Sequence, residues 1–553
     1  MKKRHLFWII PLLIIVVIFL TGLIGHLASP VPSKKLVTKY KEKKEITEKE
    51  FQEDLDYLKY YLTYSYCGYA ELLEAGFDMD AMIADIIKDC DKNKHGKTYE
   101  ASDVRANVLK RLMEYHCIDD NHFSVCGQSK LPNSLYFSDI YVKPIAADSN
   151  TESSNSPVKY VVVKNERDPF PEKVLKQMGK YTAADIQPGQ FYTGPESMLY
   201  EWFDGKEKIY RIGTLTRQNI NNIQIQIDGK KVTAPVVSNN RLEQAGKMQG
   251  MRETKDTLYI SLVDFMFGQS STVINEAEFQ KLCNIAREKS RDKKQIIIDL
   301  RSNPGGQLNR GAMLYANFFY NQQEELSHDM ILYIMRLTDE GEYISMSPEY
   351  AKANLRGWFK RIPQRFKALK YKKSAKETET EYMKYYKKIE KRYTRQLFKA
   401  SLGELIIPYS KPLQLDIPES KLTELPRPDY SGDIYVLTDK YSASCSEYSL
   451  AILYALSKNS DIKIHHIGEN TRGAIFYIDP STFVTPNSGA WMVLPTGRNY
   501  SDAFNHPDFH GEGYGWFPEY WVTQYNLLNT LTNLIDDSEL PDALQGLDKW
   551  QLQ

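Results

Sequence analysis

Ser444 is the residue whose sequence surroundings best suit a nucleophile. It lies within residues 441–447, where a predicted buried strand ends and a predicted helix begins. A hydroxyl at the amino terminus of a helix lies beside unpaired backbone N–H groups and the positive end of the helix dipole, which would stabilise an alkoxide-like oxygen. Because Ser444 and Glu447 also have the spacing of a capping box, this segment taken alone favours a simple helix cap.

A glycine-containing turn follows another predicted buried strand, at residues 299–306. Gly305 and Gly306 have no side chain, so their backbone N–H groups can approach a ligand closely. Such donors suit an oxyanion hole, in which N–H groups point at developing negative charge. The alternative is a tight turn between a strand and a helix, which this segment taken alone favours.

His122 is a candidate general base. It lies within residues 119–125, after a predicted helical region and before a short strand-like run. An imidazole within hydrogen-bonding reach of a serine can take the proton of its hydroxyl. A lone histidine is more often structural, so this segment has to be weighed together with the other two.

Together the three segments resemble the tail-specific, or C-terminal-processing, protease family. The resemblance covers residues 100–130, 256–320 and 430–535 in outline. In that family an Asp-Leu-Arg-x-Asn-x-Gly-Gly stretch is followed well downstream by Ser-Ala-Ser-x-Ser-Glu. The second serine of the later motif is the family's nucleophile, and it corresponds to Ser444.

The resemblance also implies the rest of the site and the fold. The oxyanion hole would consist of the N–H group of Cys445 and that of Gly305 or Gly306. The catalytic domain would be α/β, with ClpP/crotonase-like layers. Its substrate would be a polypeptide.

One position departs from the pattern of many family members. They carry a lysine as general base in a Gly-Glu-x-Thr-x-Gly-Lys context, whereas this chain has Ala474 in place of the lysine. Arg472 cannot substitute, because a guanidinium stays protonated at any usable pH. A Ser–Lys dyad is therefore not expected here.

A second branch of the family, which includes the tricorn core protease, uses a histidine from the amino-terminal helical domain. Residues 121–125 resemble that segment, and Glu512, six residues before Pro518, resembles the branch's glutamate. We therefore predict that His122 is the base, and that Glu512, supported by Asn121, stabilises the imidazolium. His506 and His510 lie close to Glu512 in sequence and are the alternative bases.

The amino terminus predicts a membrane anchor. Residues 2–5 are basic, and residues 6–27 contain no formally charged side chain. About 20 apolar residues cross a bilayer as a helix, and basic residues stay on the cytoplasmic side. The prediction is a single-pass protein of the cell membrane with an extracytoplasmic catalytic domain. A cleaved signal peptide is the alternative.

Hydrophobic patterns predict an α/β fold with several further parts. Nearly continuous apolar runs at 295–300 and 433–438 read as strands buried on both faces, and they alternate with helical patterns. The predicted layout is an anchor at 1–30, a spacer at 31–50, a helical domain with His122 at 51–130, a β-rich middle region, with a degenerate PDZ-like module as one interpretation, at 131–255, a catalytic α/β domain at 256–321 and 430–540, and a helical insertion at 322–429.

Composition excludes several other classes. The chain has 71 basic and 71 acidic side chains, which argues against a nucleic-acid binder that relies on a general basic field. No glycine-rich loop has the spacing of a nucleotide site, and no metal site or other cofactor is evident. Cys117 and Cys126 could pair in an oxidising compartment, or the six cysteines could be isolated thiols.

The sequence leaves two other functions open. The main alternative is a catalytically inactive relative that binds peptides or ligands at the membrane surface. A weaker one is a carrier of lipids or other apolar ligands on the same scaffold. The sequence does not predict the oligomeric state.

Overall fold

The structure is a computed structural model of the 553-residue chain. It describes residues 37, 40–145, 159–164, 186–193, 199–203, 208–238, 250–266, 276–322, 334, 342–344, 427–458, 460–499, 506–522 and 526–545. The predicted membrane segment at 6–27 and most of the predicted insertion at 322–429 lie outside these ranges. Within them, no helix has the length and apolarity needed to span a bilayer.

The described residues form two compact units. The first unit contains residues 40–130, 342–344 and 476–499. The second unit contains the other described residues from 131 onward. Residues 476–499 fall within the predicted catalytic range, yet they join the amino-terminal helices. Each unit is described by itself below.

Four helices build most of the first unit. They are α2 (Glu48–Tyr64), α3 (Tyr69–Glu74), α4 (Met79–Asp91) and α5 (Ala101–Tyr115). Helix α2 begins with a capping box, in which Thr47 and Glu50 satisfy each other's backbone N–H groups. Asp78 caps α4 by accepting from the Ala81 N–H group.

A small antiparallel sheet completes the first unit. Its strands are β3 (Ser124–Val125), β4 (Gln128–Ser129), β16 (Glu342–Ile344), β19 (Tyr477–Val484) and β20 (Trp491–Asn499). A second pair joins β1 (Glu45–Thr47) to β2 (Thr98–Glu100). Phe483 and Met492 of the β19–β20 hairpin are buried in the same apolar cluster as Leu58 and Met82 of the helices. The hairpin therefore shares the hydrophobic core of the helices.

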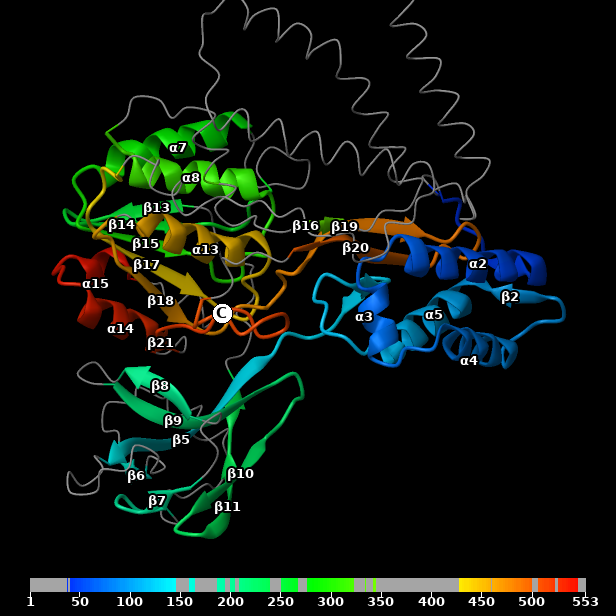
Figure 1. The fold of residues 1–553 in the computed structure, drawn as a ribbon, viewed down its shortest axis with the longest axis horizontal. Coiled ribbons are helices and arrows are strands. Elements are labelled where there is room, and N and C mark those ends of the chain that lie inside the picture. The colour runs from blue at the N-terminus through cyan, green and yellow to red at the C-terminus, as the bar shows by residue number, and fades with distance from the viewer. Residues whose placement is uncertain are drawn as a thin grey trace, which may run out of the picture. The chain divides into compact units, whose positions relative to one another are not determined.

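A mixed sheet forms the centre of the second unit (Figure 1). Along the main path its order is β11-β10-β7-β6-β5-β9-β8-β21-β18-β17-β15-β14-β13. The part with parallel pairing consists of β14 (Thr257–Ser261), β15 (Gln295–Asp299), β17 (Asp433–Thr438), β18 (Ile464–Gly468) and β21 (Tyr520–Trp521), with β13 (Gly250–Glu253) antiparallel at its edge.

Helices cover both faces of this parallel part (Figure 1). On one face lie α7 (Glu276–Ser290), α8 (Leu308–Phe319) and α13 (Cys445–Ser457). On the other face, α14 (Leu527–Leu534) and α15 (Leu540–Ala543) share a core with Tyr259, Ile297 and Leu437. Ile296 and Ile298 alternate with these strand residues and are also fully buried. The α/β architecture predicted from the apolar runs is confirmed.

The remaining strands of the sheet pair antiparallel to one another. They are β5 (Ser134–Ile145), β6 (Lys159–Val163), β7 (Phe191–Tyr192), β8 (Leu199–Phe203), β9 (Lys208–Thr216), β10 (Asn222–Ile227), β11 (Lys230–Pro235) and β12 (Val237–Ser238). Asp228 and Gly229 both have positive φ and turn β10 into β11, as the hairpin signal in the sequence predicts. Whether this region works as a PDZ-like module stays a prediction.

All six cysteines are free thiols. The suggested pairing of Cys117 with Cys126 is therefore absent, and the second interpretation, isolated thiols, describes the molecule. Cys445 is buried directly after Ser444, and burial raises the pKa of its thiol far above the ordinary range. The Cys445 side chain is therefore not a nucleophile at neutral pH.

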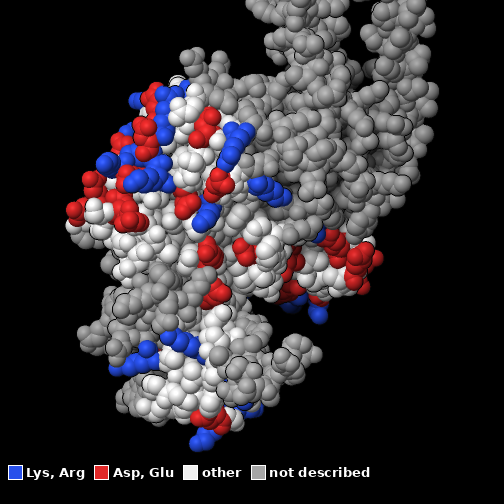
Figure 2. Space-filling view, turned by 60° about the vertical axis from the view of Figure 1, so that its left-hand side comes forward, with Lys and Arg blue, Asp and Glu red and all other residues white. Residues whose placement is uncertain are grey.

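Charges of both signs are intermixed over the described surface of the face in Figure 2. In the second unit, for example, Glu253 forms an ion pair with Lys289, and Asp256 forms one with Lys294 at 2.7 Å. Such alternation produces no extended field of one sign. This surface agrees with the zero formal charge of the sequence.

Candidate active site

Three loops of the second unit meet because the strands before them are neighbours. Strands β15, β17 and β18 are adjacent and parallel, so their carboxyl ends lie at one edge of the sheet. The loop after β15 carries Gly305 and Gly306, the loop after β17 carries Ser444, and the loop after β18 carries Ala474. Segments more than a hundred residues apart in sequence are thereby brought to one place.

Ser444 has a strained backbone. Its φ is 54° and its ψ is −116°, and α13 begins at the next residue. A non-glycine residue with positive φ is uncommon, and holding one costs of the order of 1–3 kcal/mol. A sharp turn of this kind between a strand and a helix presents a nucleophilic side chain at the edge of an α/β sheet. The conformation is more demanding than a simple helix cap requires.

Gly305 packs directly against Ser444. A Cβ atom built on Gly305 would lie 2.7 Å from the Ser444 Cβ and 2.8 Å from the Cys445 nitrogen. Gly305 also has a φ of 98°, which a side chain disfavours. Glycine at this position therefore lets two loops touch at the serine.

The structure separates the two glycines that the sequence left as alternatives. The Gly305 N–H group donates to the Asn303 side chain at 2.9 Å. Within the described ranges, the N–H groups of Gly306 and Cys445 donate to no other protein atom. These two donors are available to a ligand, which favours Gly306 with Cys445 for the oxyanion hole.

The backbone carbonyl of Asn303 and the half-buried carboxylate of Asp439 hold the serine loop to the glycine loop. The Asn303 carbonyl accepts from the Ala443 N–H group at 3.0 Å and from the Ser446 hydroxyl at 2.9 Å. The Asp439 carboxylate accepts from the N–H and hydroxyl groups of Ser302, each at 2.8 Å. Direct hydrogen bonds therefore determine the position of the Ser444 loop relative to the Gly305–Gly306 loop.

Glu447 is fully buried one turn into α13. Its carboxylate accepts four hydrogen bonds, from Ser444 N–H at 3.0 Å, Thr471 Oγ1 at 2.6 Å, Gly473 N–H at 2.7 Å and Ala474 N–H at 2.8 Å. Burial raises the pKa of Glu447 to about 7, although all four donors favour the ionised form. The sequence indicated only a capping role for this residue.

The segment that carries a lysine in many relatives lies against this carboxylate. Ala474 is 2% exposed, and the Tyr448 hydroxyl donates to the carbonyl of the next residue, Ile475, at 3.2 Å. Burial lowers the pKa of the neighbouring Arg472, while the charge of Glu447 favours its protonated form. No amine that could serve as a base stands at Ala474.

Glu512 is held by the same segment. Its Oε2 atom accepts from the Ile475 N–H group at 2.9 Å. The surrounding glycines are required by close contacts: a Cβ atom on Gly515 would clash with Thr471 Oγ1 and lie 2.8 Å from a Glu447 oxygen. The glycine-containing run near the end of the domain therefore closes over the 471–475 segment.

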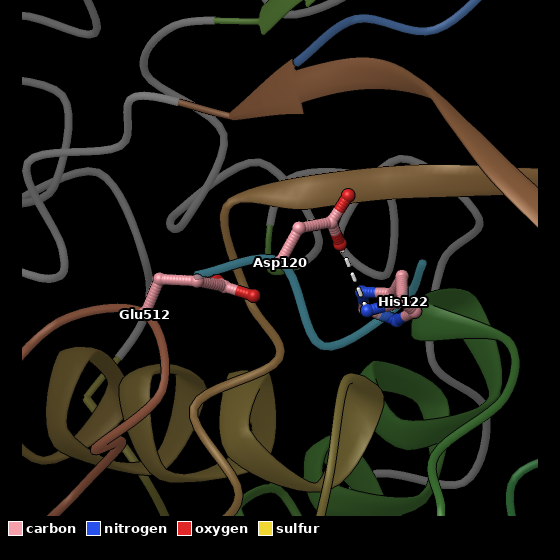
Figure 3. Close-up of side chains that lie close together, drawn as sticks. All are labelled: Asp120, His122 and Glu512. Atoms are coloured by element: carbon pink, nitrogen blue, oxygen red, sulfur yellow. Dashed lines mark hydrogen bonds between the residues drawn. The ribbon is translucent and has the colours of Figure 1, made fainter. Parts of the chain in front are cut away.

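His122 belongs to the first unit, where Asp120 determines its backbone position. The Asp120 carboxylate accepts from the His122 N–H group at 2.9 Å (Figure 3). It also accepts from the Phe123 N–H group at 3.0 Å and the Tyr66 hydroxyl at 2.8 Å. Burial raises the pKa of Asp120 to about 7. The adjacent Asn121 is buried as well. Because Ser444 lies in the other unit, a meeting of the two side chains stays a prediction.

Other histidines have partners of their own. His465 lies 3.1 Å from Glu519 through Nδ1, and the fully buried His466 lies 2.6 Å from Thr438 Oγ1. His506 stacks on Tyr454, and His510 stacks on Phe517 with ring centroids 3.7 Å apart. Burial lowers the pKa values of His506 and His510.

Comparison with known proteins identifies the family. Residues 256–512 match the model of peptidase family S41. This part of the chain is therefore an S41 peptidase region. The match spans the glycine loop, the serine loop and Glu512, so the resemblance inferred from the motifs is confirmed, and the S41 chain is a serine-type peptidase. The branch within the family stays a prediction.

Solved structures of several proteases resemble this S41 peptidase weakly. Mature CPAF has 14% sequence identity, with 89% of this chain and 98% of that chain covered and a TM-score of 0.45. A photosystem II D1 C-terminal processing protease has 11% identity, coverage of 87% and 95%, and a TM-score of 0.31. The tricorn protease has 13% identity, coverage of 91% and 37%, and a TM-score of 0.29. No curated protein sequence matches the chain significantly.

Sequence reasoning missed three positioning residues of the site: Asn303, Asp439 and Asp120. Each lies two to five residues from a predicted catalytic or oxyanion residue, and each has a short side chain able to accept backbone hydrogen bonds in a turn. This type and position are the signal that could have indicated them. Their hydrogen-bond partners could not be predicted from the sequence, because Asn303 and Asp439 connect loops that follow different strands.

Proposed function

We propose that this S41 peptidase is a membrane-anchored, extracytoplasmic endopeptidase of the tail-specific type, which cleaves polypeptides through an acyl-enzyme on Ser444. The observation that carries the proposal is the strained Ser444 backbone, with Gly305 packed against it and the Gly306 and Cys445 amides available as donors. An unassisted serine hydroxyl is a poor nucleophile near neutral pH, so a base is also required.

In the proposed reaction, neutral His122 takes the proton of Ser444 as Oγ attacks the peptide carbonyl carbon. The carbonyl oxygen becomes an oxyanion that accepts hydrogen bonds from the Gly306 and Cys445 amides. The imidazolium then gives its proton to the leaving amine, and the C–N bond breaks to leave an ester on Ser444. Water, deprotonated by the same histidine, hydrolyses this ester.

Three observations support His122 and Glu512 as base and partner. Ala474 removes the lysine that many relatives use. The buried Asp120 holds the His122 backbone through an N–H bond of 2.9 Å, so the imidazole starts from an ordered position. Glu512 is anchored by Ile475, which follows directly on the two amides bound by Glu447. A carboxylate there would stabilise the imidazolium.

Membrane anchoring rests on the sequence of residues 6–27, which is long and apolar enough to span a bilayer. The chain with residues 1–30 deleted should leave the membrane fraction, whereas the full chain should be extracted by detergent and not by high salt or carbonate. Release of the full chain by carbonate would exclude an integral anchor.

A fluorophosphonate probe tests the proposed reaction. Such a probe forms a covalent bond with an activated serine, so the purified full chain should be labelled, and Ser444→Ala should abolish labelling. Ser457→Ala, at the opposite end of α13, is the matched control and should label normally. A folded wild-type chain that does not react would favour the catalytically inactive binding protein instead.

A further inference from the structure

We propose that Glu447 is a positioning residue for catalysis, which holds Ser444 in its strained conformation and connects it to the anchor of Glu512. This inference rests on the proposed function, because Ser444 and Glu512 are the groups it would position. It assigns to Glu447 a role beyond helix capping.

The hydrogen-bond geometry favours an ionised carboxylate at Glu447. Each oxygen accepts two bonds: Oε1 from Thr471 Oγ1 and Gly473 N–H, and Oε2 from Ser444 N–H and Ala474 N–H. A carboxylate has about four acceptor sites, so all are used. A carboxamide would turn its NH₂ group toward at least one backbone N–H group that now donates to the carboxylate, so that two donors would face each other.

The bond to Ser444 lies at the strained residue itself. At a φ of 54° the Ser444 N–H group donates to Glu447 Oε2 at 3.0 Å. A charge-assisted hydrogen bond is stronger than a neutral one, and it can compensate part of the backbone strain. Without this acceptor, a more relaxed φ would become accessible to Ser444, and its hydroxyl would move relative to the oxyanion donors.

Three successive amides connect Glu447 to Glu512. Gly473 and Ala474 donate to Glu447, and Ile475 donates to Glu512 Oε2 at 2.9 Å. The 471–475 segment is fastened on its other side as well, because Gly513 N–H donates to the Gly473 carbonyl at 2.7 Å. A displacement of Glu447 would therefore shift both the serine and the proposed partner of the base.

Glu447→Gln in the full chain tests the proposal, with fluorophosphonate as the probe. We expect the inactivation rate at saturating probe to fall about 10²-fold, as a misplacement of about 1 Å can cause, with little change in the probe concentration for half-saturation. The matched control is Asp54→Asn, which removes the charge of another buried carboxylate that accepts two backbone amides, from Asn487 and Ser488, in the first unit. This control should lose stability and keep its inactivation rate.

Thr471 offers a milder pair of variants if Glu447→Gln folds poorly. Thr471→Val removes the hydroxyl that donates to Glu447 and should slow inactivation about tenfold. Thr471→Ser keeps the hydroxyl and should restore the rate. Equal rates for wild type, Thr471→Val and Glu447→Gln would overturn the proposal.

Hydrogen exchange separates this inference from the proposed function. In Glu447→Gln the amides of residues 473–475 should exchange faster than in wild type, because their acceptors are lost or displaced. Unchanged exchange there would overturn the positioning role even if Ser444 is confirmed as the nucleophile. A wild-type chain that never reacts with the probe would contradict the proposed function. The exchange experiment would still show whether Glu447 holds residues 473–475 in place.

Discussion

The Cβ atom of Ser444 lies where a side chain on Gly305 would have to be, since a Cβ built on that glycine comes within 2.7 Å of it. The glycine loop and the nucleophile loop therefore touch with no room for a methyl group. This contact sets the distance between Ser444 and the Gly306 amide, which is one of the proposed oxyanion donors.

Gly305→Ala should reduce the rate of fluorophosphonate inactivation by about 10²-fold or more, because the loop must move and take the oxyanion donors with it. The matched control is Gly189→Ala. Gly189 has nearly the same φ, 94° against 98°, but no atom lies within 4 Å of the added methyl group. Both variants share the backbone strain of a positive φ, but only Gly305→Ala adds a steric overlap, so it should lose more stability and it alone should lose reactivity. Equal reactivity of the two would show that the contact is not needed.

His122→Ala should reduce the maximal rate by about 10³-fold if His122 is the base, within the usual range for general-base catalysis. The remaining activity should lose the acid limb that a histidine base produces in a pH–rate profile. His465→Ala removes a histidine that pairs with Glu519 and should leave the profile unchanged. A wild-type pH–rate profile in His122→Ala would show that His122 is not the base, and His506 and His510 would become the candidates.

Glu512→Gln should reduce the rate by about 10²-fold or more, because the carboxamide can still accept from Ile475 N–H but cannot stabilise an imidazolium by its charge. The matched control is Glu519→Gln, which changes the partner of His465 in the same way. Labelling rates of both variants, measured across pH, provide the comparison. Full activity of Glu512→Gln would remove this residue from the proposed mechanism.

Asp120 should make stability depend on pH. Its pKa is about 7 in the folded chain, above the ordinary value of 3.8, so between these values the folded state holds a proton that the unfolded state releases. Stability from this group is therefore complete below about pH 4 and is lost as the pH rises through 7, by up to about 1.4 kcal/mol per pH unit.

Asp120→Asn should flatten that dependence, because the carboxamide cannot titrate. Thermal unfolding of the full chain at pH 5 and pH 7.5 measures it: the difference in Tm between the two values should be smaller in Asp120→Asn than in wild type. Asp119→Asn changes the partly exposed neighbouring carboxylate and serves as the control. An unchanged pH dependence in Asp120→Asn would contradict the raised pKa.

The local elements and the residue types of the candidate site could be predicted from the amino-acid sequence. Apolar runs at 295–300 and 433–438 predicted strands now seen as β15 and β17, and the serine segment predicted a helix now seen as α13. Ala474, which stands in the place of the lysine, argues against a Ser–Lys dyad. These features depend on side-chain type and short-range spacing, which a sequence displays directly.

The way in which these segments combine depends on the fold and could not be predicted from the sequence. The adjacency of β15, β17 and β18, and hence the contact of Gly305 with Ser444, depends on pairing between segments separated by a long stretch of chain. The φ of Ser444 is unfavourable locally and exists because distant groups hold it. Glu447 has the spacing of a cap in sequence, but its bonds to residues 471–474 appear only when β17 and β18 pair, since long-range hydrogen bonds leave no periodic signal in the chain.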